Sequence, residues 1–556
     1  MRPQGANPGE VDEQKLRIQA ALIHTANLFM PQILAQYEMF YLLQIVLISR
    51  MIYNILKSIS CGIVKFLIDS AIYCYICKNG FDMIIGREKE LETLRGLVNE
   101  EYSEFVAIYG RRRVGKTFLV REAFNYKFSF QHTGIAKKPK AVQLEAFRRS
   151  LRDAGYADCP HFDNWFDAFD ALKTLINASR KRKKVLFIDE ISWMDTPKGD
   201  FLACFEQFWN GWASARKDIV LIICASATSW IIDKVLKNRG GLHNRVTRKM
   251  HIRPFTLKEC EEYIVQRKFK ISRKSIITLY MILGGVAYYW SLLERSKSFA
   301  QNIDMLFFSE DAKLKDEFNA LYDSLFKKPE AYKTIVSALS EKGVGLTRQE
   351  LIDNFKQEDN GALSAKLEEL ENCDIIRRYN AYGKDTKNAL FQMVDNFTLF
   401  YFQFIKDNRS GDPSFWSNNV GSPAYNSWAG LAFERVCLQH IQQIKNALGI
   451  GGVATSQASW RTDRKLQNKN EKGAQIDLLL DRKDDTINIC EMKWSADPFL
   501  INKQEWDDIN NKVIAFTREC HPSKTIHITM VTTYGVKKNM YSDEIQSEVT
   551  ADEFFI

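Results

Sequence analysis

Three runs of consecutive apolar residues mark the first half of the chain, at residues 105–109, 185–188 and 219–225. Each run ends in glycine or polar side chains, which is typical of short buried strands of a parallel sheet. The stretches between them carry the apolar spacing of amphipathic helices, for example over residues 142–151. The pattern predicts an α/β fold built around a parallel sheet.

The first run leads directly into G-R-R-R-V-G-K-T, in which two glycines frame four residues before a lysine and a threonine. The glycines allow the backbone to curl so that successive N–H groups face a phosphate, and the following helix adds its positive end. Lys116 supplies a charge for the β- and γ-phosphates, and the Thr117 hydroxyl can hold Mg²⁺. We therefore predict that ATP and Mg²⁺ bind at Gly110, Arg111, Arg112, Arg113, Val114, Gly115, Lys116, Thr117 and Phe118.

The second and third runs add polar side chains at the same edge of the predicted sheet. The second ends in Asp189 and Glu190, which we expect to hold Mg²⁺ and to polarise the attacking water, respectively. After the third run, Ser226 is a candidate γ-phosphate sensor, or it caps the next helix. Arg239 and Arg245 lie in a glycine-bearing loop, where either one contacts the γ-phosphate or both are surface arginines.

The middle of the chain changes pattern twice. Residues 254–335 are helical with a break at Gly284-Gly285, and we interpret them as a small helical lid packed behind the nucleotide. Residues 346–352 predict a short helix with Thr347 as its N-cap, and residues 362–370 predict a second helix. A β-hairpin across Gly383 follows. Together these elements predict a winged helix over residues 336–400, a module that binds DNA or joins domains. The acids of the second helix disfavour direct DNA reading by it.

A second group of chemically suitable residues lies on two predicted strands near the C-terminus. Residues 473–482 carry Asp477, and residues 485–494 carry Glu491 and Lys493, which share a face because they are two apart in a strand. Carboxylate oxygens suit Mg²⁺, and Lys493 could orient water or neutralise charge on a phosphodiester. Glu434, on a predicted apolar helix, could complete a metal site with Asp477 and Glu491. The alternative is a structural ion pair between Lys493 and one of the two strand acids.

Residues 1–82 differ from the rest of the chain in being rich in apolar residues, most strongly over residues 41–77. Charged side chains interrupt this stretch, so it has no clean run of 18 apolar residues, and it lacks the features of a signal peptide. A membrane-associated helical hairpin is one interpretation. The simpler one is that translation starts at Met83 and that the upstream stretch is an extension of the gene model. Mass spectrometry that finds peptides from residues 15–50 in the native protein would rule the simpler interpretation out.

Composition narrows the class of protein. The chain has 556 residues with a net charge of +9 and a pI near 8.8, which permits DNA as a partner without requiring it. Its 46% hydrophobic and 26% charged residues fit a globular protein. The 11 cysteines are scattered, as in a reduced cytoplasmic protein, and the single C-x-x-C at Cys74 and Cys77 lacks the second pair that a zinc site needs. Oligomerisation is left open.

Both candidate sites resemble known families. The G-R-E-K-E-L entry, G-R-R-R-V-G-K-T, L-F-I-D-E and S-A-T-S-W resemble the archaeal-type ATPases of the STAND and AAA+ group. Asp477 followed by Glu491-x-Lys493, with Glu434 as the helix acid, is similar to the PD-(D/E)xK nuclease superfamily, whose members bind metal and cut DNA. Ile476 stands where that motif has proline. The whole arrangement resembles a prokaryotic family of ATPases with a C-terminal domain of uncharacterised function.

The changes of pattern and the resemblance together predict an order of parts along the chain: an extension (1–82), a P-loop ATPase core (83–253), a helical lid (254–335), a winged helix (336–400) and a restriction-endonuclease-like α/β domain (401–556). Two functions then compete. In one, ATP hydrolysis controls a metal-dependent DNA nuclease. In the other, the chain is a STAND-type signalling or scaffold ATPase whose C-terminal domain binds nucleic acid or protein without cutting. A membrane-attached ATPase is a third alternative.

Overall fold

The computed structural model describes residues 84–556 except 227, 238–239, 243, 342–344, 356–360, 384–388 and 463–472. The predictions for residues 1–82, for the Cys74–Cys77 pair and for Arg239 therefore lie outside the described residues. Within the part that is described, no helix has the length and apolar character needed to span a membrane.

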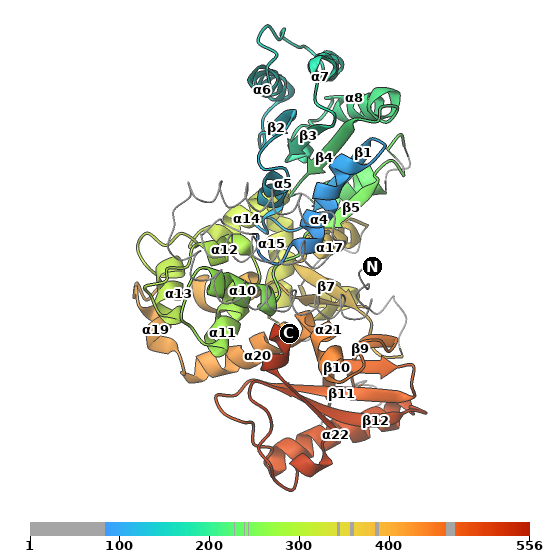
Figure 1. Cartoon of the computed structure of the whole chain (residues 1–556). Coiled ribbons are helices and arrows are strands. Elements are labelled where there is room, and N and C mark those ends of the chain that lie inside the picture. Colours follow the sequence, from blue (N-terminus) through green and yellow to red (C-terminus); the bar gives the residue numbers. More distant parts are fainter. Residues whose placement is uncertain are drawn as a thin grey trace, which may run out of the picture. The chain divides into compact units, whose positions relative to one another are not determined.

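A five-stranded parallel sheet forms the first core, which confirms the predicted α/β fold built around a parallel sheet (Figure 1). Its strand order is β2-β3-β4-β1-β5, so β1, β4 and β3 lie side by side and their carboxyl ends meet at one edge. The strands are β1 (Glu104–Tyr109), β2 (Phe130–Thr133), β3 (Lys184–Asp189), β4 (Ile219–Cys224) and β5 (Arg248–His251). The accompanying helices are α4 (Glu88–Gly96), α5 (Lys116–Ala123), α6 (Lys140–Asp153), α7 (Trp165–Ala178), α8 (Phe201–Phe208) and α9 (Thr228–Ile231).

Helices α6, α7 and α8 pack on the face of this sheet that carries Phe105 and Ala107. Phe147, Trp165 and Phe205 from the three helices are fully buried there. Layers of helix and sheet that bury such large side chains are the usual core of an α/β domain. The packing fixes the sheet, and with it the loop that follows β1.

A helical segment follows the sheet, as the sequence predicted. It comprises α10 (Leu257–Gln266), α11 (Arg273–Leu283), α12 (Ala287–Ser291), α13 (Phe299–Phe307), α14 (Glu317–Leu325) and α15 (Pro329–Ser340). The break at Gly284-Gly285 has a steric cause, because a Cβ at Gly285 would lie 1.9 Å from the carbonyl oxygen of Phe255. Helix α15 runs across residue 335, where the sequence placed a boundary between two parts.

The predicted short helices and hairpin of the next segment are present. Helices α16 (Arg348–Phe355) and α17 (Gly361–Asn372) accompany a three-stranded antiparallel sheet of β6 (Leu346–Thr347), β8 (Leu390–Met393) and β7 (Ile376–Tyr379), in that spatial order. Thr347 accepts a hydrogen bond from the Glu350 backbone N–H at 3.1 Å, which confirms it as the N-cap. The prediction that this helix begins at Leu346 was wrong, because β6 takes Leu346 and Thr347 into the sheet.

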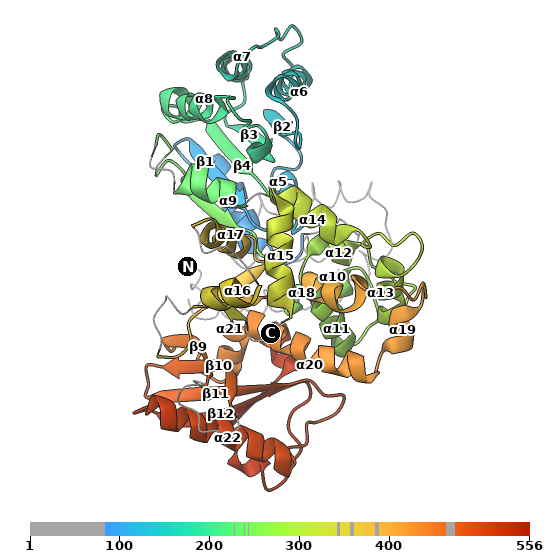
Figure 2. The same cartoon turned by 180° about the vertical axis from the view of Figure 1, so that it is seen from behind.

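The last part of the chain forms a mixed parallel and antiparallel sheet of order β13-β12-β11-β10-β9, four strands of which are labelled in Figure 2. Its strands are β9 (Thr455–Arg461), β10 (Gln475–Arg482), β11 (Thr486–Lys493), β12 (Thr525–Thr532) and β13 (Ser547–Thr550). The two predicted strands are β10 and β11, and they pair antiparallel as expected. The helices are α18 (Asn396–Phe400), α19 (Phe415–Asn419), α20 (Pro423–Gln439), α21 (Ile441–Ala447) and α22 (Lys503–Cys520).

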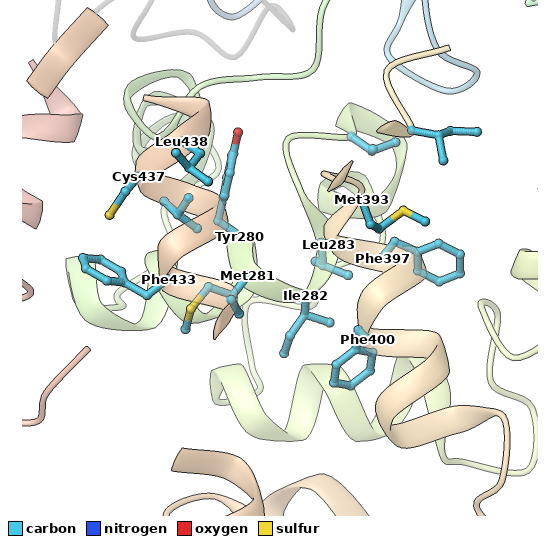
Figure 3. Close-up of a cluster of buried hydrophobic side chains, with 14 of the residues drawn as sticks. Tyr280, Met281, Ile282, Leu283, Met393, Phe397, Phe400, Phe433, Cys437 and Leu438 are labelled. Carbon is cyan, nitrogen blue, oxygen red and sulfur yellow. The ribbon is translucent and has the colours of Figure 1, made fainter. Parts of the chain in front are cut away.

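The two faces of the mixed sheet have different helical cover. Phe516 of α22 packs with Leu479 and Ile489 on one face. On the other side, α20 belongs to a larger core that also contains α11 and α18. Figure 3 shows a part of that core, with Phe397 and Phe400 of α18 near Leu283 of α11. Helix α18 is thus held in a packed interior.

Candidate functional site

The loop after β1 has the backbone that its glycines predict. Gly110 has φ +136°, and a Cβ there would lie 2.3 Å from the Ile252 carbonyl oxygen, so a larger residue would be both strained and obstructed. Gly115 has φ +94° and directly precedes α5. Lys116 begins that helix, and its ammonium donates to the carbonyl oxygens of Gly110 and Arg111 at 2.9 Å each. The positive charge therefore lies over the loop that would hold a phosphate.

The residues that we predicted for Mg²⁺ and water lie together at the carboxyl edge of the sheet. The Thr117 hydroxyl donates to Asp189 Oδ2 at 2.7 Å. Burial raises the pKa of Asp189, and the neighbouring charge of Glu190 acts in the same direction. A cation beside Thr117 and Asp189 would relieve both effects. The hydroxyl and carboxylate oxygens are also ligands that Mg²⁺ favours, so the two residues fit that ion.

Glu190 and Ser226 are direct partners. Glu190 has a left-handed backbone (φ +48°), and its carboxylate accepts hydrogen bonds from the Ser226 backbone N–H at 3.1 Å and from the Ser226 hydroxyl. Ser226 thus connects the end of β4 with the end of β3. Its hydroxyl is committed to Glu190, and its role as a γ-phosphate sensor stays a prediction.

The other predicted nucleotide contacts have diverse surroundings. Val114 is buried, whereas Phe118 is 44% exposed. Arg112 donates to the Ala320 carbonyl oxygen at 3.4 Å, and Arg245 is exposed. Arg111 and Arg113 pair with acids far along the chain, namely Asp395 and Glu317. No local pattern in the sequence connects Arg111 with Asp395 or Arg113 with Glu317.

The C-terminal group of predicted residues lies at one end of the mixed sheet. Leu478 is opposite Cys490 in the β10–β11 ladder, so Asp477 and Glu491 are the next residues along and face each other. Lys493 Nζ lies 3.2 Å from Glu491 Oε1, as the shared face predicts. Gln475 Nε2 donates to Asp477 Oδ1 at 2.6 Å. Glu434 reaches this end from α20, which begins earlier than the predicted apolar helix.

Two residues of α22 complete the charge pattern, and the sequence did not point to either. Lys512 Nζ lies 2.6 Å from Glu491 Oε2, and Glu505 Oε2 lies 3.4 Å from Lys493 Nζ. Burial lowers the pKa of Lys493, but Glu491 and Glu505 outweigh burial, and the pKa is raised overall. Helical spacing brings Glu505 and Lys512 to the same stretch of α22, a signal that is visible only once the helix is known to cover this face.

The acids of this group interact strongly. The pKa of Glu434 is raised to about 7, mainly by burial and in addition by the neighbouring charges of Asp477 and Glu491. Mutual repulsion of carboxylates is what a bound cation would relieve, so the chemistry of the donor set fits Mg²⁺. In the arrangement of the described residues, however, no three His, Cys, Asp or Glu side chains converge closely enough to hold a metal ion. Glu491 is instead engaged by the two lysines.

The segment of α16, α17 and the three-stranded sheet contacts both the part of the chain around the parallel sheet and the part around the mixed sheet. Toward the first, His251 Nε2 lies 3.0 Å from Asp374 Oδ2, and Lys237 Nζ lies 2.6 Å from Glu368 Oε1 of α17. Burial raises the pKa of the Cys373 thiol, and the nearby positive charge of Lys116 acts in the opposite direction. The end of α17 is therefore near the phosphate loop.

Toward the second site, the hairpin lies along β9. The Tyr382 N–H donates to the Ser459 carbonyl oxygen at 2.8 Å, and the Tyr382 ring lies 5.1 Å from that of Phe516. Burial lowers the pKa of Arg377 in β7 to about 10, while the charge of Asp477 acts in the opposite direction. The hairpin thus brings an arginine close to Asp477.

Comparison with known proteins finds a family for the part of the chain that holds the first site. Residues 84–293 match a family described as an ATPase domain predominantly from Archaea. An uncharacterized protein of Methanocaldococcus jannaschii, MJECL04, is 24% identical over 417 residues, which span 74% of this chain and 88% of that protein. An uncharacterized ATP-binding protein of the same organism, MJ0423, is 42% identical over 48 residues, which span 9% of this chain and 81% of that protein.

Solved structures with similarity to this chain include a protein of Pyrococcus abyssi and a protein of Aeropyrum pernix. The Walker-type ATPase PABY2304 of Pyrococcus abyssi has a TM-score of 0.42 at 14% identity, with 58% of this chain and 96% of that chain covered. The ORC2 protein of Aeropyrum pernix, solved as ADPNP–ADP complexes, has a TM-score of 0.36 at 14% identity, with 59% and 95% covered.

Proposed function

We propose that this chain, whose residues 84–293 match an ATPase domain family predominantly from Archaea, uses ATP to control a metal-dependent DNA nuclease in its C-terminal part. The observation that carries the proposal is the group of Asp477, Glu491 and Lys493 at one end of the mixed sheet, joined by Glu434 from α20. A strand pair of otherwise buried apolar residues rarely carries such a group without a function, because burying charge is costly.

At the ATP site, each residue has a role that its position supports. The loop N–H groups and Lys116 bind the phosphates, and Thr117 with Asp189 would hold Mg²⁺, which supplies positive charge at the β- and γ-phosphates. Glu190 orients the attacking water, and Ser226 holds Glu190 by two hydrogen bonds. Each oxygen of Glu190 accepts one of these bonds, so each keeps a second acceptor site that can bind the water.

At the second site, Asp477, Glu491 and Glu434 would hold Mg²⁺ once Glu491 turns away from its lysines and the three carboxylates converge. The ion would supply Lewis-acid polarisation of a phosphodiester. Lys493 orients the attacking water or neutralises charge on the phosphodiester oxygens. Lys512 and Lys493 both bond to Glu491. If the carboxylate turns toward a cation, Lys512 becomes available for the DNA phosphates, while Lys493 keeps its pairing with Glu505.

The segment between the sites supports communication between them. Asp374 and Glu368 contact the ATPase core, while Tyr382 and Arg377 approach the C-terminal sheet. If this segment is a winged helix, its second helix and its wing are engaged within the chain. We therefore propose that it joins the two active parts, and that DNA contacts the C-terminal domain.

The test is cleavage of linear, branched and single-stranded DNA by the full chain with Mg²⁺ or Mn²⁺. We expect cleavage by the natural sequence and its loss in Asp477→Asn and Glu491→Gln. Asp481→Asn is the matched control, because Asp481 lies on the same strand and pairs with Lys524 instead. Equal cleavage in Glu491→Gln and Asp481→Asn would rule out the proposed site.

A second candidate function is favoured by the contacts of Glu491. Because both of its oxygens are ion-paired with lysines, the group can be a stable charged cluster without a metal. The chain would then be a switch ATPase whose C-terminal domain binds nucleic acid or protein. The absence of metal-dependent cleavage on every DNA form, with ATP turnover intact, would support this alternative.

A further inference from the structure

The phosphate loop carries arginines whose partners lie outside the parallel sheet. Arg111 pairs with Asp395, and both side chains are buried, at 3% and 1% exposure. Arg113 pairs with Glu317, and its guanidinium lies 4.4 Å from the centre of the Tyr288 ring. Arg113 also has a left-handed backbone (φ +69°), which costs about 1 kcal/mol for a residue other than glycine. The loop conformation is therefore stabilised from outside.

The two acids are held in place independently of the loop. Asp395 is the N-cap of α18, where its Oδ2 accepts hydrogen bonds from the Thr398 N–H at 3.2 Å and from the Thr398 hydroxyl at 2.6 Å. Phe397 and Phe400 anchor the same helix in the core of Figure 3. Glu317 accepts a hydrogen bond from the Tyr289 hydroxyl at 2.8 Å. A movement of the loop thus requires the pairs to break or the helices to move.

The environment of Arg111 points to function rather than to stability. Its Nε and Nη2 atoms are buried without a hydrogen-bond partner among the described residues. A buried guanidinium with unpartnered nitrogens lowers the free energy of unfolding, because desolvation of these atoms is not compensated. An apolar residue would be the more stable choice if the position served packing alone.

Asp395 also begins a connection toward the second site. Its backbone N–H and that of Val394 donate to the Ile375 carbonyl oxygen, at 3.2 and 3.0 Å. Ile375 directly precedes β7, and β7 carries Arg377, whose charge interacts with that of Asp477. A displacement of Arg111 would therefore reach the strand that approaches Asp477.

We propose that Asp395 is a positioning residue of the ATP site, which sets the phosphate-loop conformation through Arg111 and transmits nucleotide binding to α18 and β7. The proposal rests on ATP binding and is independent of nuclease activity. When bound nucleotide fixes the loop, the position of Arg111 relative to Asp395 changes. Asp395 shifts in response, and α18 and β7 shift with it because both are bonded to Asp395 or to its neighbours.

The test uses Asp395→Asn in the full chain. Asparagine is also a good N-cap, so the substitution keeps the cap of α18 and removes the charge that faces Arg111. We expect ATP affinity to fall about tenfold, roughly the effect of one charge-assisted hydrogen bond. Hydrogen exchange then provides a measurement that a purely structural role would not change. At saturating ATP, the ATP-induced change in exchange over residues 375–379 and 395–400 should fall to less than about half of its natural size.

Asp218→Asn is the control, because Asp218 pairs with Lys184 at 2.7 Å at the start of β3, at the far end of the sheet from the loop. It should bind ATP and respond to it like the natural sequence. If Asp395→Asn does not fold, Arg111→Met with Asp395→Asn removes the unpaired buried charge. In that variant, the deciding measurement is the ATP-induced change in exchange at saturating ATP, because Arg111 itself is a predicted ATP contact. A variant of Asp395 that binds ATP and shows the full ATP-induced exchange change overturns the proposal.

Discussion

Glu190→Gln should separate ATP binding from ATP hydrolysis. The substitution keeps the size of the side chain and removes its charge, so the attacking water loses its polarising group. Loss of such a group lowers turnover by about 10²–10⁴-fold, which corresponds to about 3–5 kcal/mol of activation free energy. Lys116, Thr117 and Asp189 are unchanged, so ATP affinity should stay within about threefold of the natural value.

The structure also predicts the effect of this substitution on stability. The two oxygens of Glu190 accept one hydrogen bond each from Ser226, and glutamine retains only one acceptor oxygen. The free energy of unfolding should therefore fall by no more than about 1.5–3 kcal/mol, the contribution of one hydrogen bond to a charged group. Such a loss leaves the chain folded at assay temperature.

The assay is phosphate release at saturating ATP, with calorimetry for ATP affinity. Asp195→Asn is the matched control, because Asp195 lies close by in sequence and accepts a hydrogen bond from the Trp230 indole at 2.8 Å. The control should hydrolyse ATP at the natural rate. If Glu190→Gln retains more than about a third of natural turnover, another residue activates the water and our assignment of Glu190 is wrong.

Two further predictions concern the C-terminal part. The folded-state pKa of Glu434, about 7, lies above its ordinary value of 4.5, so its contribution to stability is complete below about pH 4.5 and is lost as pH rises through 7. Urea unfolding between about pH 5 and 8 should show this decrease in the natural sequence and a smaller one in Glu434→Gln; identical slopes would contradict the assignment. Tyr382→Ala removes a ring contact with Phe516 that contributes about 0.5–1.5 kcal/mol. It should weaken any effect of ATP on the C-terminal domain about 2- to 10-fold while ATP turnover stays unchanged, and an undiminished effect would show that the hairpin does not join the sites.

The elements that the sequence predicted correctly are those whose pattern is local. The run into G-R-R-R-V-G-K-T and the runs that end in Asp189 and in Ser226 became three adjacent strands. The i, i+2 spacing of Glu491 and Lys493 became a shared strand face. Each of these features depends on backbone geometry within a few residues, so the spacing of residue types along the chain is enough to predict it.

The features that the sequence did not reveal depend on contacts between distant segments. Strand β5 contains Arg248 and Lys249, so its composition does not resemble a strand, and it forms because β1 offers a free edge. The pairing of Arg111 with Asp395 and the placement of Lys512 beside Glu491 join segments with no shared pattern. Such contacts follow from the packing of helices on sheets, which short-range periodicity does not specify.

The most direct test of ATP control over the second site is DNA cleavage with Mg²⁺ or Mn²⁺, measured with and without ATP. The natural sequence is compared with Lys116→Ala, which lacks the charge that binds the β- and γ-phosphates. We predict that ATP changes the rate of cleavage by the natural sequence and has no effect on Lys116→Ala. If ATP leaves the rate of cleavage unchanged in the natural sequence as well as in Lys116→Ala, ATP does not control the second site.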